Sequence, residues 1–196
     1  MPIEIEAKMR LDDRAALVQT LQRLGAAFVA ELAETNSYFD VEDGALKRSD
    51  QALRLRIEVT GPGTPEERTV NILAHKGPRS PGKLKSREET EVHVDDPAAI
   101  VKLLNALGYR SVLTFEKRRT RYRLEGCLIE LDELPRLGHF VEIEGPSESQ
   151  VFAVREQLGL ADSPLIETSY IGLLKAYLRE TGGDDTAVCF APAERM

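Results

Sequence analysis

The chain has 196 residues, 42% of them hydrophobic and 30% charged, and a formal net charge of −7. Such a chain is long enough for one globular domain with a buried core, and its acidic balance argues against general affinity for nucleic acid or an anionic membrane surface. No apolar run reaches the ~20 residues of a membrane span, and the charged N-terminus lacks the apolar core of a signal peptide. We therefore expect a cytoplasmic protein.

Charged and apolar side chains alternate over residues 3–10, which form the first predicted strand. Because successive strand residues point to opposite faces, Glu4, Glu6 and Lys8 share one face. Residues 12–25 follow as a predicted helix, with an aspartate cap, apolar residues at helical spacing and a glycine stop.

The next part of the chain predicts a series of strands. Arg54 and Arg56 occupy one face of the second of them, opposite apolar residues. Polar turns and a segment rich in glycine and proline separate the strands, because such residues disfavour ladder formation. The predicted ranges are 26–40, 51–60, 68–76 and, after a basic loop, a strand that begins at Lys85.

A repeat relates the two halves of the sequence. Residues 95–108 match residues 12–25 at a constant offset of 83, from the capping aspartate pairs Asp12-Asp13 and Asp95-Asp96 to the glycine stops Gly25 and Gly108. Two similar capped amphipathic helices would also explain the match. The wider pattern favours two strand–helix–strand halves packed with approximate two-fold symmetry.

The second half ends in strands, helices and a tail. Residues 181–196 have the glycine and polar content of a flexible tail, so we expect one domain over residues 1–180 followed by this tail. The predicted strands are 109–124, 128–134 and 139–144, and the predicted helices are 146–159 and 169–180.

Acidic and basic side chains gather on one face of most strands. On an open sheet they would form a salt-bridged surface in water. In a closed barrel they would line an interior in which unpaired ions carry a large desolvation cost. The acidic members are Glu4, Glu6, Glu89, Glu91, Glu130, Asp132, Glu142 and Glu144, and the basic members are Lys8, Arg54, Arg56, Lys76, Lys85, Arg87, Lys117, Arg119 and Arg121.

A polyphosphate with a divalent metal ion would complement such an interior. Its anionic oxygens would bind the lysines and arginines, and carboxylates would hold a hard cation such as Mg²⁺ or Mn²⁺. Arginine binds phosphate through two parallel hydrogen bonds, whereas lysine acts as a point charge.

Several motifs in order along the chain resemble the CYTH superfamily, which comprises class IV adenylyl cyclases, thiamine triphosphatases and inorganic triphosphatases. The resemblance runs from Glu4 to about Tyr177 and implies an α+β fold, an eight-stranded antiparallel triphosphate-tunnel barrel with flanking helices. The motifs are Glu4-x-Glu6-x-Lys8, Tyr38-Phe39-Asp40, Leu53-Arg54-Leu55-Arg56, Lys76-Gly77-Pro78, Arg87-x-Glu89-x-Glu91, Lys117-x-Arg119 and the run from Leu137 to Glu144.

The resemblance also implies roles for individual residues. The catalytic candidates are Lys76, Tyr38 and Glu6, since a similar lysine–tyrosine pair is proposed to position water in some family triphosphatases. The implied metal ligands are Glu4, Glu6, Glu142 and Glu144, supported by Glu130 or Asp132. The implied phosphate contacts are Lys8, Arg54, Arg56, Lys76, Arg87, Lys117 and Arg119, and Lys85 joins them from the basic face of its strand.

The motifs look most like the class IV cyclase group, which converts ATP to cyclic AMP and pyrophosphate. One departure is Ala74, where these cyclases tend to have a threonine. A triphosphate hydrolase acting on thiamine triphosphate or tripolyphosphate is the alternative reading, and a non-catalytic polyphosphate or nucleotide-binding module is a third. The expected partner is a small triphosphate molecule with Mg²⁺ or Mn²⁺, not nucleic acid or a membrane, and a homodimer is one expected assembly.

Overall fold

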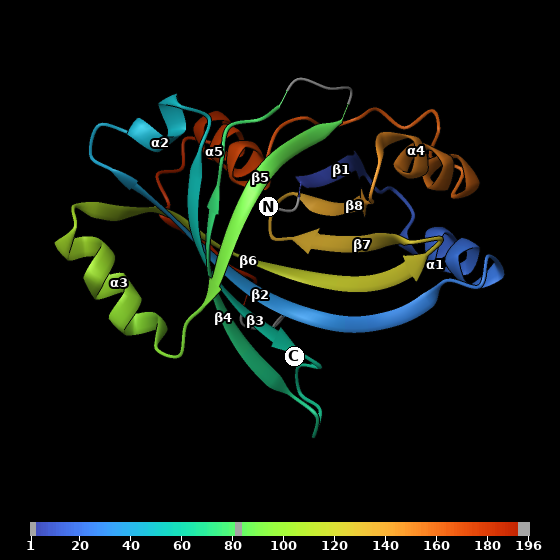
Figure 1. The fold of residues 1–196 in the computed structure, drawn as a ribbon, viewed down its shortest axis with the longest axis horizontal. Helices are drawn as coiled ribbons and strands as arrows, with labels where there is room; N and C mark the ends of the chain where they lie inside the picture. Colours follow the sequence, from blue (N-terminus) through green and yellow to red (C-terminus); the bar gives the residue numbers. More distant parts are fainter. Residues whose placement is uncertain (1–2, 81–83, 192–196) are drawn as a thin grey trace.

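The structure is a computed structural model that describes residues 3–80 and 84–191. Its strands and helices follow the predicted ranges closely, and they enclose a barrel (Figure 1). The strands are β1 Ile3–Arg10, β2 Ala27–Val41, β3 Ala52–Thr60, β4 Arg68–Lys76, β5 Lys85–His93, β6 Tyr109–Leu124, β7 Cys127–Leu134, β8 Gly138–Glu144 and β9 Ala187–Val188. The helices are α1 Arg14–Arg23, α2 Ala45–Arg48, α3 Pro97–Ala106, α4 Glu148–Gln157 and α5 Tyr170–Glu180.

The sheet closes on itself. Hydrogen-bonded neighbours follow the order β2, β3, β4, β5, β1, β8, β7, β6, and β6 pairs with β2 to complete a ring of eight strands among the described residues. All pairings within this ring are antiparallel. The predicted α+β barrel with flanking helices is confirmed. Because side chains alternate along each strand, one set of residues must point into the ring.

The two-fold relation between the halves is also confirmed. Helices α1 and α3 begin at Arg14 and Pro97, 83 residues apart, and each is capped by an aspartate that accepts a hydrogen bond from the backbone N–H three residues later. In the β2–β6 ladder Glu34 faces Lys117, its own equivalent at the offset of 83. Across the barrel, in β1–β5, Glu4 faces Arg87 in the same way. The approximate axis therefore passes through both pairs.

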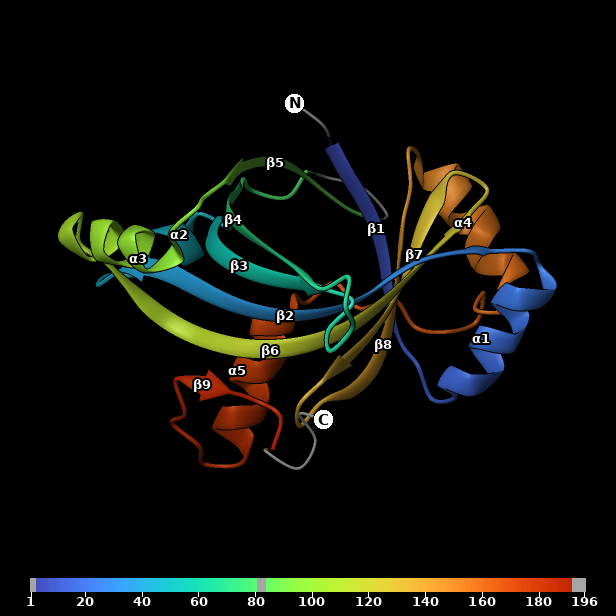
Figure 2. The ribbon, with the colours of Figure 1, turned by 90° about the horizontal axis from the view of Figure 1, so that it is seen from below.

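The helices lie around the outside of the barrel (Figure 2). Charged side chains line much of the interior. One apolar cluster joins α1 and α4 to β1, β7 and β8, a second lies beneath α5, and a third lies beneath α3. Their members include fully buried residues such as Met9, Ile143 and Leu174. No helix among the described residues is long and apolar enough to cross a membrane.

The structure adds two local features to the predicted ones. A short helix, α2, follows the polar turn after β2, and its backbone N–H groups at Leu46 and Lys47 donate to the Asp40 carboxylate. The tail is not frayed up to Ala191, because β9 pairs with β6 beyond the end of the β6–β7 ladder and buries Val188 against the α5 cluster. Residues 192–196 lie outside the described residues.

The buried position of Val188 makes this segment part of the folded unit. Val188→Asp is expected to lower the free energy of unfolding by about 2 kcal/mol or more, because a charge replaces an apolar side chain that is wholly buried. Ala187→Asp, one residue away on the exposed face of β9, is the control and is expected to change stability by less than about 0.5 kcal/mol. Urea unfolding measures both. Equal stability of the two variants would restore the flexible-tail interpretation.

Candidate active site

The barrel encloses a cavity of about 1000 Å³. It is lined by residues of all eight ring strands, so the charged stripes predicted from the sequence converge on one space. The predicted site residues among the lining are Glu6, Lys8, Tyr38, Arg54, Arg56, Lys76, Arg87, Lys117, Arg119, Glu130, Glu142 and Glu144. The open-sheet alternative, with these charges on a flat solvated face, is therefore wrong.

Three predicted site residues are not among the residues described as lining the cavity. The side chains of Glu4 and Lys85 lie outside what the structure describes. Asp132 points into the barrel but does not line the cavity, and its two oxygens accept hydrogen bonds from Arg119 and from the Tyr170 hydroxyl. Both oxygens already have protein donors, so Asp132 holds other site residues in place and is a poor candidate for a metal ligand.

Arg119 on β6 is the centre of a buried ion network. Its guanidinium donates two 2.6 Å hydrogen bonds to Asp132, a third of 2.6 Å to Glu142, and also contacts Glu130. Burial alone would lower the pKa of Arg119, but the Asp132 and Glu130 carboxylates outweigh it and raise this pKa well above its ordinary value. Arg119 therefore stays charged and holds the acids of β7 and β8 in place.

Glu34 on β2 belongs to this network, although the sequence analysis did not select it. One of its oxygens lies 3.2 Å from Lys117 Nζ and accepts a hydrogen bond from Asn36. Burial alone would raise the pKa of Glu34, but the charges of Lys117 and Arg119 hold it well below its ordinary value. The sequence could have identified Glu34, because Glu34 and Asn36 lie two residues apart on the same face of β2 as the predicted site residue Tyr38.

A second group of charges lies on β3, β4 and β5. Arg54 and Arg56 approach Glu89 and Glu91 at 3.3 to 3.6 Å, and Lys76 Nζ lies 2.8 Å from Glu89. Hydrogen bonds between charged groups are usually 2.7 to 2.9 Å long. The arginine pairs are longer than this, and Arg56 Nε has no hydrogen-bond partner among the described residues. These guanidinium groups can therefore exchange their carboxylate partners for a more strongly binding anion in the cavity.

Tyr170, the first residue of α5, reaches into the interior and was also missed. Its ring packs against Phe140, and Lys8 Nζ lies 4.2 Å from the ring centre. Burial raises the pKa of Tyr170 well above its ordinary value, so the hydroxyl keeps its proton and donates to Asp132 at 2.8 Å. Tyr170 thus connects α5 to the ion network.

Glu6 and Glu144 are acids of the cavity wall that could hold a metal ion. They are direct register partners on β1 and β8, and both line the cavity. Two facing carboxylates can share one cation, and carboxylate oxygens are the ligands that Mg²⁺ and Mn²⁺ prefer. Glu142 is close by, opposite Lys8, with Lys8 Nζ 3.6 Å from one of its oxygens. Among the described residues no group of three or more acids, histidines or cysteines is already arranged for a metal.

A closed antiparallel barrel with cations and carboxylates on its inner wall is a tunnel-type barrel. The CYTH domain model matches residues 2–170. The chain belongs to the CYTH family.

Individual proteins and solved structures are also similar to this chain. Adenylate cyclase CyaB of Aeromonas hydrophila is 28% identical over 177 residues, which cover 85% of this chain and 86% of that protein. The structure of the PH1819 protein from Pyrococcus horikoshii is 27% identical, with a TM-score of 0.77 over 89% of this chain and 99% of that one. HpAC1 from Hippeastrum is 21% identical, with a TM-score of 0.65 over 98% and 100%, and its description reports a dominant triphosphatase activity.

Proposed function

We propose that the protein is a metal-dependent enzyme that binds a triphosphate inside the barrel and converts ATP to cyclic AMP and pyrophosphate. The observation that carries this proposal is the convergence of Lys8, Arg54, Arg56, Lys76 and Arg119 on one cavity from different strands. Phosphoryl and nucleotidyl transfer are accelerated mainly by positioning and by stabilising charge on the phosphate oxygens. Cations held by the strands of a closed barrel are suited to both tasks.

The reaction needs few additional groups. The ribose 3′-oxygen forms a bond to the α-phosphorus, the bond between this phosphorus and the bridging oxygen of the β-phosphate breaks, and pyrophosphate leaves while the 3′-hydroxyl proton is released. Arg54, Arg56 and Lys76 would hold the departing phosphates. Glu6 and Glu144, with Glu142, would hold Mg²⁺ or Mn²⁺, which neutralises charge on the phosphate oxygens when bound.

The size and lining of the cavity support a nucleotide as substrate. About 1000 Å³ lies at the upper end of the usual range of 300–1,000 Å³ for small-molecule sites. Beyond the charged walls, the lining includes apolar side chains, among them Leu46, Val112 and Ile171. A nucleoside needs such a surface, whereas tripolyphosphate does not.

Triphosphate hydrolysis is the second candidate. Tyr38 and Lys76 both line the cavity, and this pair fits the positioning of a water molecule at the terminal phosphate. The described activity of HpAC1 is in keeping with hydrolysis on this fold. The two reactions use the same cations and differ only in the nucleophile and the phosphorus attacked.

Product analysis separates the candidates. ATP, thiamine triphosphate and tripolyphosphate are each incubated with the protein and Mg²⁺ or Mn²⁺, and the products are followed by phosphorus NMR and chromatography. We expect cyclic AMP and pyrophosphate from ATP. Orthophosphate without cyclic AMP would overturn the cyclase proposal in favour of hydrolysis. If the protein bound these compounds but converted none of them, it would be a non-catalytic binding module.

A further inference from the structure

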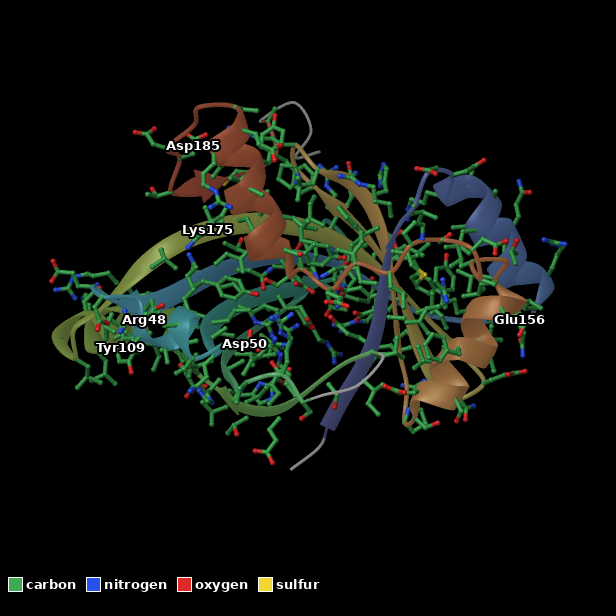
Figure 3. The ribbon with its side chains drawn as sticks, turned by 90° about the horizontal axis from the view of Figure 1, so that it is seen from above. Arg48, Asp50, Tyr109, Glu156, Lys175 and Asp185 are labelled. Atoms are coloured by element: carbon green, nitrogen blue, oxygen red, sulfur yellow. The ribbon has the colours of Figure 1, made fainter. Side chains whose placement is uncertain are left out.

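Tyr170 enters the barrel because of its place at the start of α5. Tyr170 and Leu174 are four residues apart, so they share one face of the helix, and both are buried. The segment before the helix is fixed to β1, since the Ile166 N–H donates to the backbone carbonyl of Lys8 at 2.8 Å. Figure 3 shows α5 beginning near the middle of the barrel and running outward to the loop that contains Asp185. The helix therefore places the Tyr170 side chain among the charges of the cavity.

The Tyr170 side chain contacts residues of four neighbouring strands. Its ring packs edge to face against Phe140 on β8, with 5.2 Å between the ring centres. The ammonium groups of Lys8 on β1 and Lys117 on β6 lie 4.2 and 5.5 Å from the ring centre, where a cation is attracted to an aromatic face. The hydroxyl donates to Asp132 on β7. Because the ring is held on several sides, the position of the hydroxyl is fixed.

One oxygen of Asp132 already has two donors. Oδ2 accepts a hydrogen bond from the Arg119 guanidinium at 2.6 Å and another from the Tyr170 hydroxyl at 2.8 Å. A carboxylate oxygen offers about two lone-pair positions, so these two bonds fill Oδ2. Lys117 Nζ lies 3.5 Å from the same oxygen, which is longer than the usual 2.7 to 2.9 Å of a hydrogen bond between charged groups. Asp132 therefore attracts Lys117 without holding it in a short bond.

The distance between Lys117 and Asp132 matters because Lys117 lines the cavity. On its other side, Lys117 Nζ lies 3.2 Å from an oxygen of Glu34. An ammonium group has three N–H donors, so a short bond to Asp132 can form beside the contact with Glu34. Two close carboxylates would neutralise the ammonium group and leave it fewer donors. Lys117 would then bind a phosphate group in the cavity less strongly.

We propose that Tyr170 is a positioning residue whose hydroxyl occupies Asp132 Oδ2 and thereby keeps Lys117 available to the triphosphate. A neutral hydroxyl suits this task, because it fills the acceptor position without adding a charge that would compete for phosphate. Burial raises the pKa of Tyr170 well above its ordinary value, so the hydroxyl remains a donor. The inference rests on the proposed function, because Lys117 needs a triphosphate in the barrel as its partner.

Tyr170→Phe tests the proposal, because it removes the hydroxyl and keeps the ring. The dissociation constant for tripolyphosphate is measured by calorimetry with Mg²⁺, and urea unfolding checks that the variant is folded. We expect binding to weaken on the order of tenfold, since the hydrogen bonding of a charged group to phosphate is reduced. Tyr177→Phe is the matched control. Tyr177 packs against the same apolar cluster from the same helix but is not among the cavity-lining residues that the structure describes, so this variant should bind like the wild type.

A second background tests whether Tyr170 acts through Lys117. Lys117→Met should weaken binding by itself, and the addition of Tyr170→Phe should then have no further effect. A general loosening of α5 would instead weaken binding equally in both backgrounds. The crystal structure of Tyr170→Phe without ligand gives an independent measure, which does not depend on the stability of the double variant. We expect Lys117 Nζ to lie within about 3 Å of Asp132 Oδ2 in this structure.

The outcomes separate this inference from the proposed function. Equal affinities of Tyr170→Phe and Tyr177→Phe would overturn the positioning role, and so would additive losses in the double variant or an unchanged distance between Lys117 and Asp132. Absence of tripolyphosphate binding by the wild type would instead overturn the proposed function. The distance between Lys117 and Asp132 in Tyr170→Phe would still show whether the hydroxyl holds the two groups apart.

Discussion

Arg119→Met is expected to lower the free energy of unfolding by about 3–5 kcal/mol, the usual loss when one partner of a buried ion network is removed. The substitution keeps most of the side-chain volume but leaves Asp132, Glu142 and Glu130 without their shared cation. These carboxylates are almost fully buried, so the lost hydrogen bonds leave their charges in a poorly hydrated interior.

The neighbouring residue provides the control. Arg118 is on the same strand but on its outer face, where its pair with Glu133 is more than one-third exposed on both sides. Arg118→Met is expected to cost about 1 kcal/mol, including its contact with the Phe190 ring. Urea unfolding of both variants measures the difference. If Arg119→Met were as stable as Arg118→Met, the network would not hold the barrel together.

Glu6→Gln is expected to reduce metal-dependent turnover by about 100-fold or more, since losing even an outer-shell partner of a metal ligand typically costs 10–100-fold. The change removes one negative charge from the facing pair of Glu6 and Glu144 and keeps the side chain's size. The fold should therefore persist while the affinity for Mg²⁺ falls. Turnover is measured over a range of Mg²⁺ concentrations, together with urea unfolding.

Glu88→Gln is the matched control for this variant. Glu88 is on the adjacent strand β5 and is exposed, so the same chemical change occurs outside the cavity. Its turnover and metal dependence should equal those of the wild type. Full activity of Glu6→Gln at low Mg²⁺ would remove Glu6 from the proposed metal site.

Strict alternation made much of the fold predictable. Over residues 53–59 of β3 and 141–144 of β8, apolar and charged residues alternate, so both the strand and its inward face could be assigned from the sequence. The repeat of aspartate cap and glycine stop located α1 and α3 for a similar reason, because each signal has a local physical cause.

Features that depend on contacts distant in sequence were not predictable. Tyr170 looks like an ordinary first residue of an amphipathic helix until α5 is placed over the barrel end. The packing of Val188 depends on a stretch of β6 that β7 leaves unpaired. The alternation of β7 places Asp132 on the inward face, where a metal ligand would lie. Only the positions of Arg119 and Tyr170 reveal that its oxygens already accept hydrogen bonds.

The symmetry axis through Glu34 and Lys117 limits how the barrel could have arisen by duplication. In an ancestor assembled from two copies of one half, the axis would bring each residue at this position against itself. Two glutamates or two lysines would then face each other in the buried interior, where like charges repel. An attractive pair such as Glu34 and Lys117 can form on the axis only if the two halves have different residues at this position. The present ion network therefore required the sequences of the two halves to diverge.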